Sequence, residues 1–432
     1  GFREQMSSFE LKSLPNTGDD TGQLFRNYKQ ICKFLRNELG QEGEIQRIKN
    51  LYNCLLQNVS IVEIDVVDPA SGPKIFDSLN SRQEPMTIGD LVRNEIFSRA
   101  ATWEDDRLEE IDQSCWRPFY ERFDHDGTNY FDDYFFPFGL IHNPNLKKSS
   151  VFQWLKEKWR EIEDPRPIIE ELGEYQTDFL DARTGSRLAG HSDDWSSAIG
   201  RLRRAALPSS TLPFLMQLSR EVRAEGLDEP EGVKILAVLE SFLVRRAVCG
   251  FEPTGLHAVF KRLWQDCQEG PTALMAAQEI GKHKTVTWPS DDDFRDALLN
   301  RGLYETKACE VLLREYDSSL GGDIPDAQVW IEHVLPQKAT KEWRDSFGRA
   351  KAEDALHTIA NLLPLSPNMN QGLGNKPYKE KRKVYHSNSM YKSVRVFADE
   401  NETWTAESHA ARGKKIADWA ISRWPHTRPN SS

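Results

Sequence analysis

Apolar residues recur along the first three hundred positions at the three- and four-residue spacing that places side chains on one face of a helix. One apolar stripe runs from Ile235 through Val238 and Leu239 to Phe242, and another lies within residues 151–162. Stretches that contain glycine and proline separate such segments, as expected for turns between helices. The pattern therefore predicts a mainly α-helical protein.

Three stretches rich in Gly, Pro, Ser or Asp predict breaks between the helical segments. They are Asp68–Pro73, Gly250–Gly255 and Ser318–Pro325. The sequence shows no internal repeat and no low-complexity tract, so we expect distinct helical segments rather than a repeat array.

The pattern changes after the last of these breaks. Two short β-prone runs, Val329–Ile331 and Leu362–Leu365, are separated by a long connection. A loop rich in Asn and Gly then leads to a helical pattern over Lys376–Tyr385. Pro364 in the second run is typical of a strand edge or end. The order strand, long loop, strand, loop, helix predicts a small ββα unit within a helical protein.

Length and composition limit the classes of protein to consider. The chain has 432 residues, 38% of them apolar and 28% charged, which is typical of a globular protein with two or three domains. It has no apolar run approaching the roughly 18 residues of a membrane helix and no secretory signal, so no membrane association is expected. The six cysteines form no C-x-x-C pair, which argues against a zinc ribbon and favours a reducing, cytoplasmic location. Because the first residue is Gly1 rather than Met, we expect the sequence to be part of a longer one.

The charge is unevenly distributed. The chain carries 56 Lys and Arg against 67 Asp and Glu, and this net charge of −11 argues by itself against a nucleic-acid-binding protein. From Lys338 onward, however, there are 17 basic and 10 acidic residues, whereas residues 1–337 contain 39 and 57. The last quarter of the chain is therefore the part expected to approach a polyanion.

The segment Ile331–Gln337 carries the most informative chemistry. It places the carboxylate of Glu332 beside the imidazole of His333 at the predicted end of a strand, which Pro336 marks. Neighbours on a strand point to opposite faces, so both groups reach one site only where the strand ends or distorts. Carboxylate and amide oxygens suit Mg²⁺, and a neutral histidine beside such an ion is a natural general base for a water nucleophile. The amides available downstream are Asn361, Asn368, Asn370 and Asn375.

A structural interpretation of these residues stays open. An isolated Glu-His pair among ten histidines is usually structural or on the surface, and runs of Asn and Gly usually form turns. A basic run follows the loop and could hold a nucleic-acid backbone beside the site. Its members are Lys376, Lys379, Lys381, Arg382 and Lys383.

Two further segments are assigned structural roles. Asp124–Asn129 hints at a calcium-binding loop, but an EF-hand has Gly where Asn129 stands and Glu where Phe135 stands, so we predict a turn. The aromatic stretch Tyr130–Phe138 could stack on bases, but packing between helices is its expected use.

The string E-H-V-L-P-Q at Glu332–Gln337 resembles the E/D-H-I-x-P-Q motif of HNH nucleases, the His-Me finger or ββα-metal class. More specifically, it resembles the C-terminal nuclease domain of GmrSD-type, modification-dependent (type IV) restriction proteins and SspE-like phage-defence proteins. Residues 357–363 resemble the family pattern h-x-I-G-N-L-t-L, with Ala360 in place of Gly. Residues 370–381 resemble its N-x4-N-x2-F-x2-K pattern, and the strings 404–405 and 423–425 fit its tail.

The upstream half resembles the same proteins. Residues 75–82 and 91–94 are similar to strings that close the family's N-terminal sensor and nucleotide-hydrolysing domain, although Gln83 stands where Gly is usual. The D-G-Q-Q-R-type nucleotide motif of that domain is not found in the sequence, and neither is a P-loop. No NTPase activity is therefore expected from this sequence.

The resemblance implies three regions. Residues 1–100 would be the C-terminal remnant of the sensor domain, 101–284 a helical middle domain, and 285–432 an HNH-like ββα-metal nuclease domain. The implied fold class is mainly α, with helical domains and a C-terminal ββα-metal core.

The resemblance also implies a role for each matching residue. His333 matches the general base that takes a proton from water, and Glu332 and Asn370 match the metal-holding positions. Asn361 matches the middle Asn that fixes the His-bearing loop through hydrogen bonds. Lys381 matches the helix lysine near the phosphate.

The implied cofactor is Mg²⁺, with Mn²⁺ as a substitute, and the implied partner is DNA, including modified or phage DNA. Asn368 and Asn375 stay open as alternatives to Asn370, because the loop sequence does not select the ligand. The oligomeric state is also open, and a dimer would supply the two sites that a double-strand break requires.

The sequence thus predicts a Mg²⁺-dependent DNA endonuclease that nicks one strand in a restriction or anti-phage system. The alternative is a non-catalytic helical module that binds DNA or a partner through a degenerate nuclease core. Ala360 and Gln83 fit that alternative, whereas the intact pair of Glu332 and His333 argues against it.

Overall fold

The chain divides into two compact units, Gly1–Asp68 and Pro69–Ser432, and every element named below belongs to the second. The predicted break at Asp68–Pro73 and the string at 75–82 lie outside the described residues. The structure, a computed structural model, describes residues 86–100, 105–205, 208–267, 270–322 and 329–426, together with isolated helical residues between 30 and 57.

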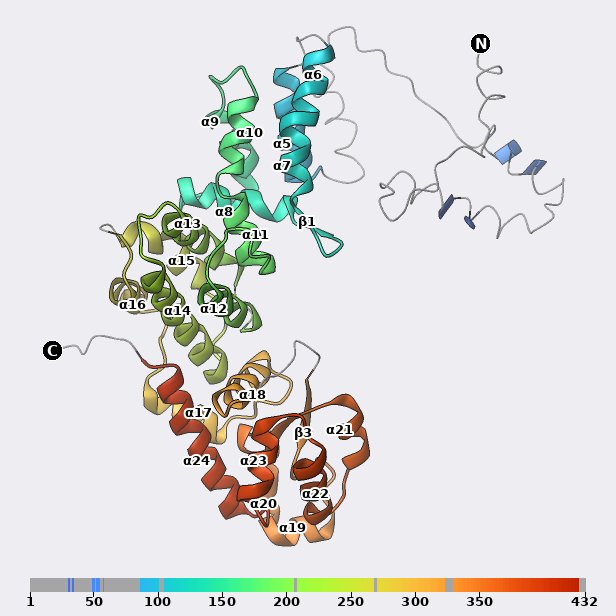
Figure 1. The fold of residues 1–432 in the computed structure, drawn as a ribbon, viewed down its shortest axis with the longest axis vertical. Coiled ribbons are helices and arrows are strands. Elements are labelled where there is room, and N and C mark those ends of the chain that lie inside the picture. Colours follow the sequence, from blue (N-terminus) through green and yellow to red (C-terminus); the bar gives the residue numbers. More distant parts are fainter. Residues whose placement is uncertain are drawn as a thin grey trace. The chain divides into compact units, whose positions relative to one another are not determined.

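Helices dominate the described residues, which confirms the prediction of a mainly α-helical protein (Figure 1). The elements up to Lys282 are α5 (Ile88–Arg99), α6 (Asp105–Ile111), η2 (Asp112–Trp116), α7 (Arg117–Glu121), β1 (Asp124–His125), β2 (Thr128–Asn129), α8 (Phe131–His142), η3 (Lys148–Ser150), α9 (Val151–Lys158), α10 (Arg166–Gly173), α11 (Gln176–Thr184), α12 (Asp193–Arg204), η4 (Ser209–Thr211), α13 (Leu212–Arg223), α14 (Glu229–Cys249), α15 (Leu256–Asp266) and α16 (Ala273–Lys282).

The remaining elements include the one sheet that the described residues form beyond the short β1–β2 hairpin. They are α17 (Asp291–Asn300), α18 (Lys307–Ser319), β3 (Trp330–His333), α19 (Lys341–Phe347), α20 (Arg349–Ala355), η5 (Ile359–Asn361), β4 (Leu362–Leu365), α21 (Pro367–Leu373), α22 (Tyr378–Asn388), α23 (Lys392–Glu400) and α24 (Ala406–Arg423).

Helix α14 connects the earlier helices to the later ones. It carries the predicted apolar stripe, and Ile235, Leu239 and Phe242 are fully buried. The helix ends at Gly250, whose φ of +77° is the left-handed conformation that favours glycine. It packs against α12, α13 and α16, and also against α17 and α18, as Figure 1 shows.

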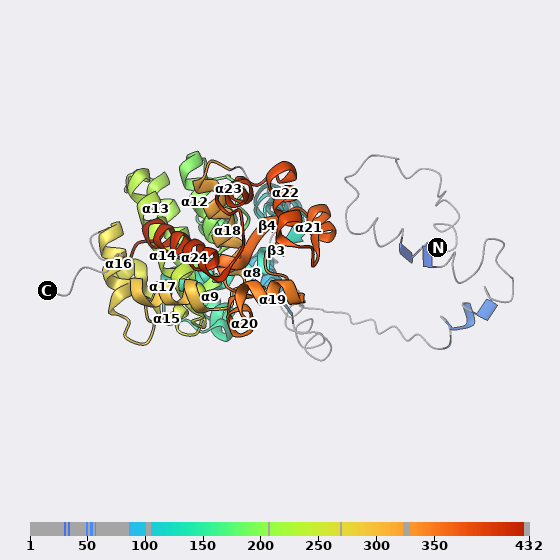
Figure 2. The same ribbon diagram turned by 90° about the horizontal axis from the view of Figure 1, so that it is seen from below.

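Both predicted strands are present, and β3 and β4 pair in antiparallel orientation. In the register, Glu332 lies opposite Leu363 and His333 lies opposite Leu362. Figure 2 shows the two strands side by side, with α21 and α22 next to them. All four residues of β4 are buried, so the pair lies within the protein rather than on its surface.

Parts of the predicted order around these strands are wrong. The connection between the strands, expected to be a long loop, contains α19 and α20. The Asn- and Gly-rich segment forms α21, because Pro367 occupies a first-turn position where its missing N–H leaves no hydrogen bond unmade. The helix expected over Lys376–Tyr385 instead begins at Tyr378 and runs to Asn388.

The two segments given structural roles are confirmed in those roles. Asp124–Asn129 is a tight hairpin in which Asp126 and Gly127 have positive φ values of 50° and 76°. The aromatic stretch falls on α8, where its rings pack inside the protein. The buried aromatic residues of this helix are Phe131, Tyr134, Phe135 and Phe138.

The buried apolar side chains form three clusters within the described residues. The first extends from Val92 to Trp288. The second joins Val244 and Val248 of α14 to residues of α17, α18 and α24. The third lies around β4, α22 and α23 and includes Trp404. Helix α14 contributes to the first two clusters. The predicted domain boundaries at 100/101 and 284/285 stay predictions. None of the described helices is both long and apolar enough to span a membrane.

Arg245 is a fully buried cation that joins α14 to the last part of the chain. Its Nε donates to the carbonyl of Trp424 at 2.7 Å, and Nη1 donates to the carbonyl of Pro289 at 3.1 Å. Nη2 donates to Oδ1 of Asp291 at 2.5 Å. A buried charge is tolerated only when it is paired and hydrogen-bonded, so this arrangement favours one docking of α14 on α17 and α24.

Replacing Arg245 with Ala is expected to lower the free energy of unfolding by about 3 kcal/mol, because two buried carbonyl groups lose their donor. The control is Arg262→Ala, whose side chain is 51% exposed and 3.9 Å from Asp266. Its effect should stay below about 0.5 kcal/mol. Chemical and thermal denaturation measure both variants, and equal losses would contradict the role given to Arg245.

Candidate active site

The candidate site is built at the end of β3. Glu332 and His333 are adjacent on this strand and have different partners. Glu332 bonds to α22, whereas His333 contacts His357 and Tyr304. This separation follows from the alternation of side chains along a strand.

His333 is buried, with 7% of its surface exposed, and lies against a second histidine. Its Nε2 is 3.1 Å from Nδ1 of His357, so one of these nitrogens donates and the other accepts. The ring of Tyr304 lies edge-on to His333 at 4.4 Å and stacks on His357 at 5.5 Å. Tyr304 and His357 are both partly exposed, so the pair lies where solvent approaches the strand end.

Burial lowers the pKa of His333 to about 4, and the nearby charges of His357 and Lys381 act in the same direction. The imidazole is therefore neutral near pH 7. If His333 donates through Nε2 to His357, its Nδ1 keeps the lone pair that a general base needs.

The carboxylate of Glu332 is 5% exposed and accepts two hydrogen bonds at the same oxygen. Lys381 Nζ donates to its Oε1 at 2.7 Å and the Tyr385 hydroxyl donates at 2.9 Å. Burial raises the pKa of Glu332 and lowers that of Lys381, while the attraction between the two charges opposes both shifts. The pair is thus a buried ionic contact between β3 and α22.

Lys381, which the sequence predicts near the phosphate, is fully buried. Besides Glu332, its ammonium group donates to the carbonyl oxygens of His333 at 2.8 Å and Val334 at 3.3 Å. In this arrangement it positions the end of β3 from within the protein.

Asn361 holds the segment that follows His333. Its Oδ1 accepts from the backbone N–H of Leu335 at 2.7 Å, and its Nδ2 donates to the carbonyl of Leu335 at 3.0 Å. Nδ2 also donates to the carbonyl of Leu356 at 2.9 Å, and Trp404 donates to Oδ1 at 3.3 Å. The fully buried Asn361 side chain therefore links β3 to the approach to β4 and to Trp404.

The three loop asparagines named as ligand candidates lie on or after α21. Asn370 and Asn368 are residues of this helix, and their side chains lie outside the described part. Asn375 is exposed in the turn before α22. Helix α21 as a whole packs against β3, the strand that bears Glu332.

The basic run divides into buried and exposed members. Lys376, Lys379 and Lys383 are exposed, whereas Lys381 is buried. Arg382 donates through Nε to the carbonyl of Ala398 at 2.7 Å. Three exposed lysines thus remain available on this surface for an anionic backbone.

Sequence reasoning missed three residues of the site. His357 belonged to a family string but had no assigned role, and Tyr304 gave no signal, because only the fold brings them to His333. Tyr385 did give a signal, since it follows Lys381 by four residues and so shares its helix face.

The residues at the site fit a hard cation in chemical type. The described part of the chain contains no group of three or more His, Cys, Asp or Glu residues that could hold a metal. Mg²⁺ needs only one or two protein oxygens because it keeps several waters. Glu332 supplies such an oxygen, although a cation there would share the carboxylate with Lys381.

Comparison with known proteins identifies the region that contains this site. Residues 288–419 match a family model described as GmrSD restriction endonucleases, C-terminal domain. The match covers β3, β4 and α22 together with His333 and His357, and it confirms the resemblance of this C-terminal region to GmrSD-type restriction proteins. No curated protein matches the chain.

Replacing Lys381 with Met should lower the free energy of unfolding by about 3 kcal/mol, because Glu332 would be left buried without its counter-charge. Adding Glu332→Gln to this variant should recover part of the loss. The control is Lys383→Met on the same helix, an exposed position where little change is expected. Urea denaturation of the wild type, the two single variants and the double variant measures the coupling free energy between Lys381 and Glu332. Strictly additive losses of stability would contradict an ionic contact between these two side chains.

Proposed function

From the premise that residues 288–419 form a GmrSD-type restriction endonuclease C-terminal domain, we propose that this domain is a metal-dependent nickase of the HNH class. The antiparallel pair β3–β4 and helix α22 would form its ββα core. The observation that carries the proposal is the buried His333 imidazole at the end of β3, held by His357 inside the matched region.

His333 is the proposed general base. A neutral imidazole accepts a proton from water, and the water oxygen then attacks the phosphorus of a DNA phosphodiester. The bond from phosphorus to the 3′ oxygen breaks, which leaves a 3′-hydroxyl and a 5′-phosphate. His357 is a positioning residue, because its Nδ1 orients His333 through the 3.1 Å contact.

Glu332 and Asn370 are the proposed holders of Mg²⁺, with Mn²⁺ as a substitute. The bound ion would stabilise the charge that develops on the phosphate and on the leaving oxygen. Asn361 and Lys381 support the site from within, since they hold residues 333–335 by backbone contacts. The exposed lysines of the basic run would contact the DNA backbone.

One such site cuts one strand, so we propose nicking as the elementary reaction. A double-strand break would need two sites, which a dimer would supply. Resemblance to restriction proteins suggests a cytoplasmic role against phage or other modified foreign DNA.

Incubation with supercoiled plasmid and Mg²⁺ or Mn²⁺ tests the proposal. Nicked circles should form and should disappear with EDTA. His333→Ala should lower the rate by at least about 100-fold. His386→Ala is the matched control, because His386 is 63% exposed and lies on α22 paired with Asp399. DNA binding without metal-dependent cleavage would favour the non-catalytic alternative.

The positioning role of His357 has its own test. His357→Ala should lower the nicking rate by about tenfold or more, because His333 loses its hydrogen-bond partner. His357→Asn should recover part of the rate, since an asparagine amide reaches the position of Nδ1. Equal rates for the two variants would contradict a role through that atom.

A further inference from the structure

A solvent-open cavity of about 730 Å³ lies at the end of α11, along α12 and against α18. Four arginines line it, Arg187, Arg201, Arg203 and Arg204, against the single lining carboxylate of Glu315. We call it the arginine cavity. Such a concentration of positive charge is unexpected in this part of the chain, because residues 1–337 carry 39 basic and 57 acidic residues.

Helix α12 presents these side chains because its two faces differ. One face buries Trp195, Ile199 and Leu202 in the first apolar cluster. The other face carries Arg201 and Arg204, which are three residues apart and therefore neighbours on the helix surface.

One glycine leaves room for an arginine head group. A Cβ atom at Gly185, which follows α11 with a φ of +75°, would collide with the guanidinium of Arg203. A residue without a side chain thus stands where this guanidinium group passes.

The loop that carries Arg187 is also held in place. Arg187 has a positive φ of 60°, which is unfavourable for a residue with a side chain. The carboxylate of Asp181 compensates by accepting from the backbone N–H groups of Leu188 at 2.6 Å and Ala189 at 2.7 Å, and from the hydroxyl of Ser186 at 2.6 Å.

The acidic partners of Arg187, Arg201 and Arg204 leave hydrogen-bond donors available. Arg201 donates through Nε to the buried Glu240 at 3.0 Å. Arg204 is 40% exposed and lies 3.7 Å from Glu315, which is too far for a hydrogen bond. Arg187 is 59% exposed and pairs with the exposed Asp193, a weak surface contact. A guanidinium has five N–H donors, so one carboxylate does not saturate it.

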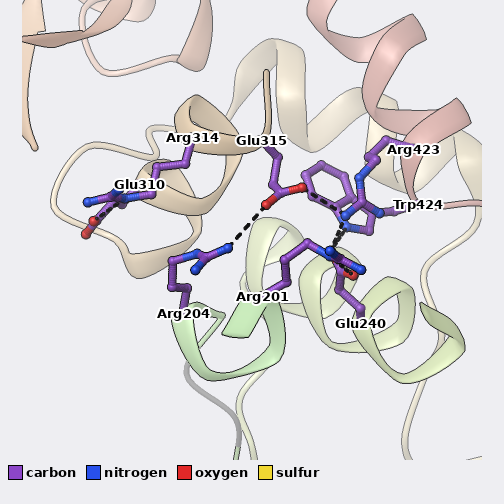
Figure 3. A network of polar contacts seen from close by, with 8 residues as sticks. All are labelled: Arg201, Arg204, Glu240, Glu310, Arg314, Glu315, Arg423 and Trp424. Carbon is purple, nitrogen blue, oxygen red and sulfur yellow. Dashed lines mark hydrogen bonds and ion pairs between the residues drawn. The ribbon is translucent and has the colours of Figure 1, made fainter. Parts of the chain in front are cut away.

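Glu240 and Glu315 also bind a second cation, Arg423, so part of their negative charge is already neutralised and they attract the cavity arginines less strongly. Arg423 donates to Glu240 at 2.7 Å and to Glu315 at 2.9 Å, and Trp424 donates to Glu240 at 2.8 Å. Figure 3 shows the two carboxylates between Arg201, Arg204 and Arg423.

We propose that the arginine cavity binds phosphate groups, supplied either by a nucleotide or by the backbone of DNA. Arginine suits phosphate because its planar fork donates two parallel hydrogen bonds and stays charged at all relevant pH values. Three serines, Ser196, Ser197 and Ser318, add hydroxyl donors to the lining. The cavity lining contains no aromatic ring among the described residues, which favours recognition of phosphate over stacking of bases.

This site is independent of the proposed cleavage reaction. The lining residues of the arginine cavity lie in the segment after α11, on α12 and on α18, whereas the nuclease proposal rests on β3, β4 and α22. Ligand binding in EDTA reports on the cavity and metal-dependent nicking reports on the strand end, so failure of either proposal is distinguishable from failure of the other.

The test measures binding of a short DNA duplex by fluorescence anisotropy in EDTA, and of ATP by calorimetry. The double variant Arg187→Gln/Arg204→Gln should weaken binding of one of these ligands by about tenfold. Its control, Arg160→Gln/Arg262→Gln, removes the same charge at positions that are 66% and 51% exposed and are not part of the lining, and it should bind like the wild type. A selective effect on ATP identifies a nucleotide site, and a selective effect on DNA identifies a backbone site.

A second variant guards against a folding effect of losing two arginines. Ser197→Asp keeps every arginine and places a negative charge in the cavity, so it should weaken the same ligand. For DNA, the double variant should also reduce the slope of log affinity against log salt by about 2. The proposal is overturned if the wild type binds neither ligand, or if the cavity variants bind both as tightly as the control.

Discussion

The buried ammonium group of Lys381 is the constraint on which the candidate site depends. It joins helix α22 to strand β3 through Glu332 and through the carbonyl groups of His333 and Val334. A buried ammonium is costly unless it keeps such partners, so the strand end and the helix cannot separate without exposing or unpairing a charge. The backbone of His333 is therefore held by an electrostatic contact rather than by a long sheet.

Asn361 constrains the same segment from the other side. Lys381 binds the carbonyls of residues 333 and 334, and Asn361 binds both backbone groups of Leu335. Strands of four residues form few backbone hydrogen bonds with each other. The side chains of Lys381 and Asn361 add further hydrogen bonds to the backbone of residues 333–335. The His333–His357 contact thus rests on a backbone that side-chain hydrogen bonds hold from both sides.

Much of the fold was predictable because its signals are local. The stripe on α14 follows from side-chain periodicity, and the runs at β3 and β4 follow from the β-prone residues they contain. Helix α21 was missed because its Asn- and Gly-rich sequence is typical of turns, although Pro367 was a signal for a helix start. The site was predictable only in part. A lysine in the basic run of α22 gives no sign that it turns inward. His333 and His357 are 24 positions apart, and the sequence between them carries no information about their contact.

Trp424 sets a limit on how the chain can be divided. Its ring is fully buried, its indole donates to Glu240, and its carbonyl accepts from Arg245, yet it lies five residues beyond the matched region, which ends at 419. A fragment that ended at residue 419 would leave Glu240 and Arg245 of α14 without their hydrogen bonds to Trp424. The smallest piece to express on its own therefore includes both α14 and Trp424, and exchange of the nuclease region between relatives would have to carry the long helix with it.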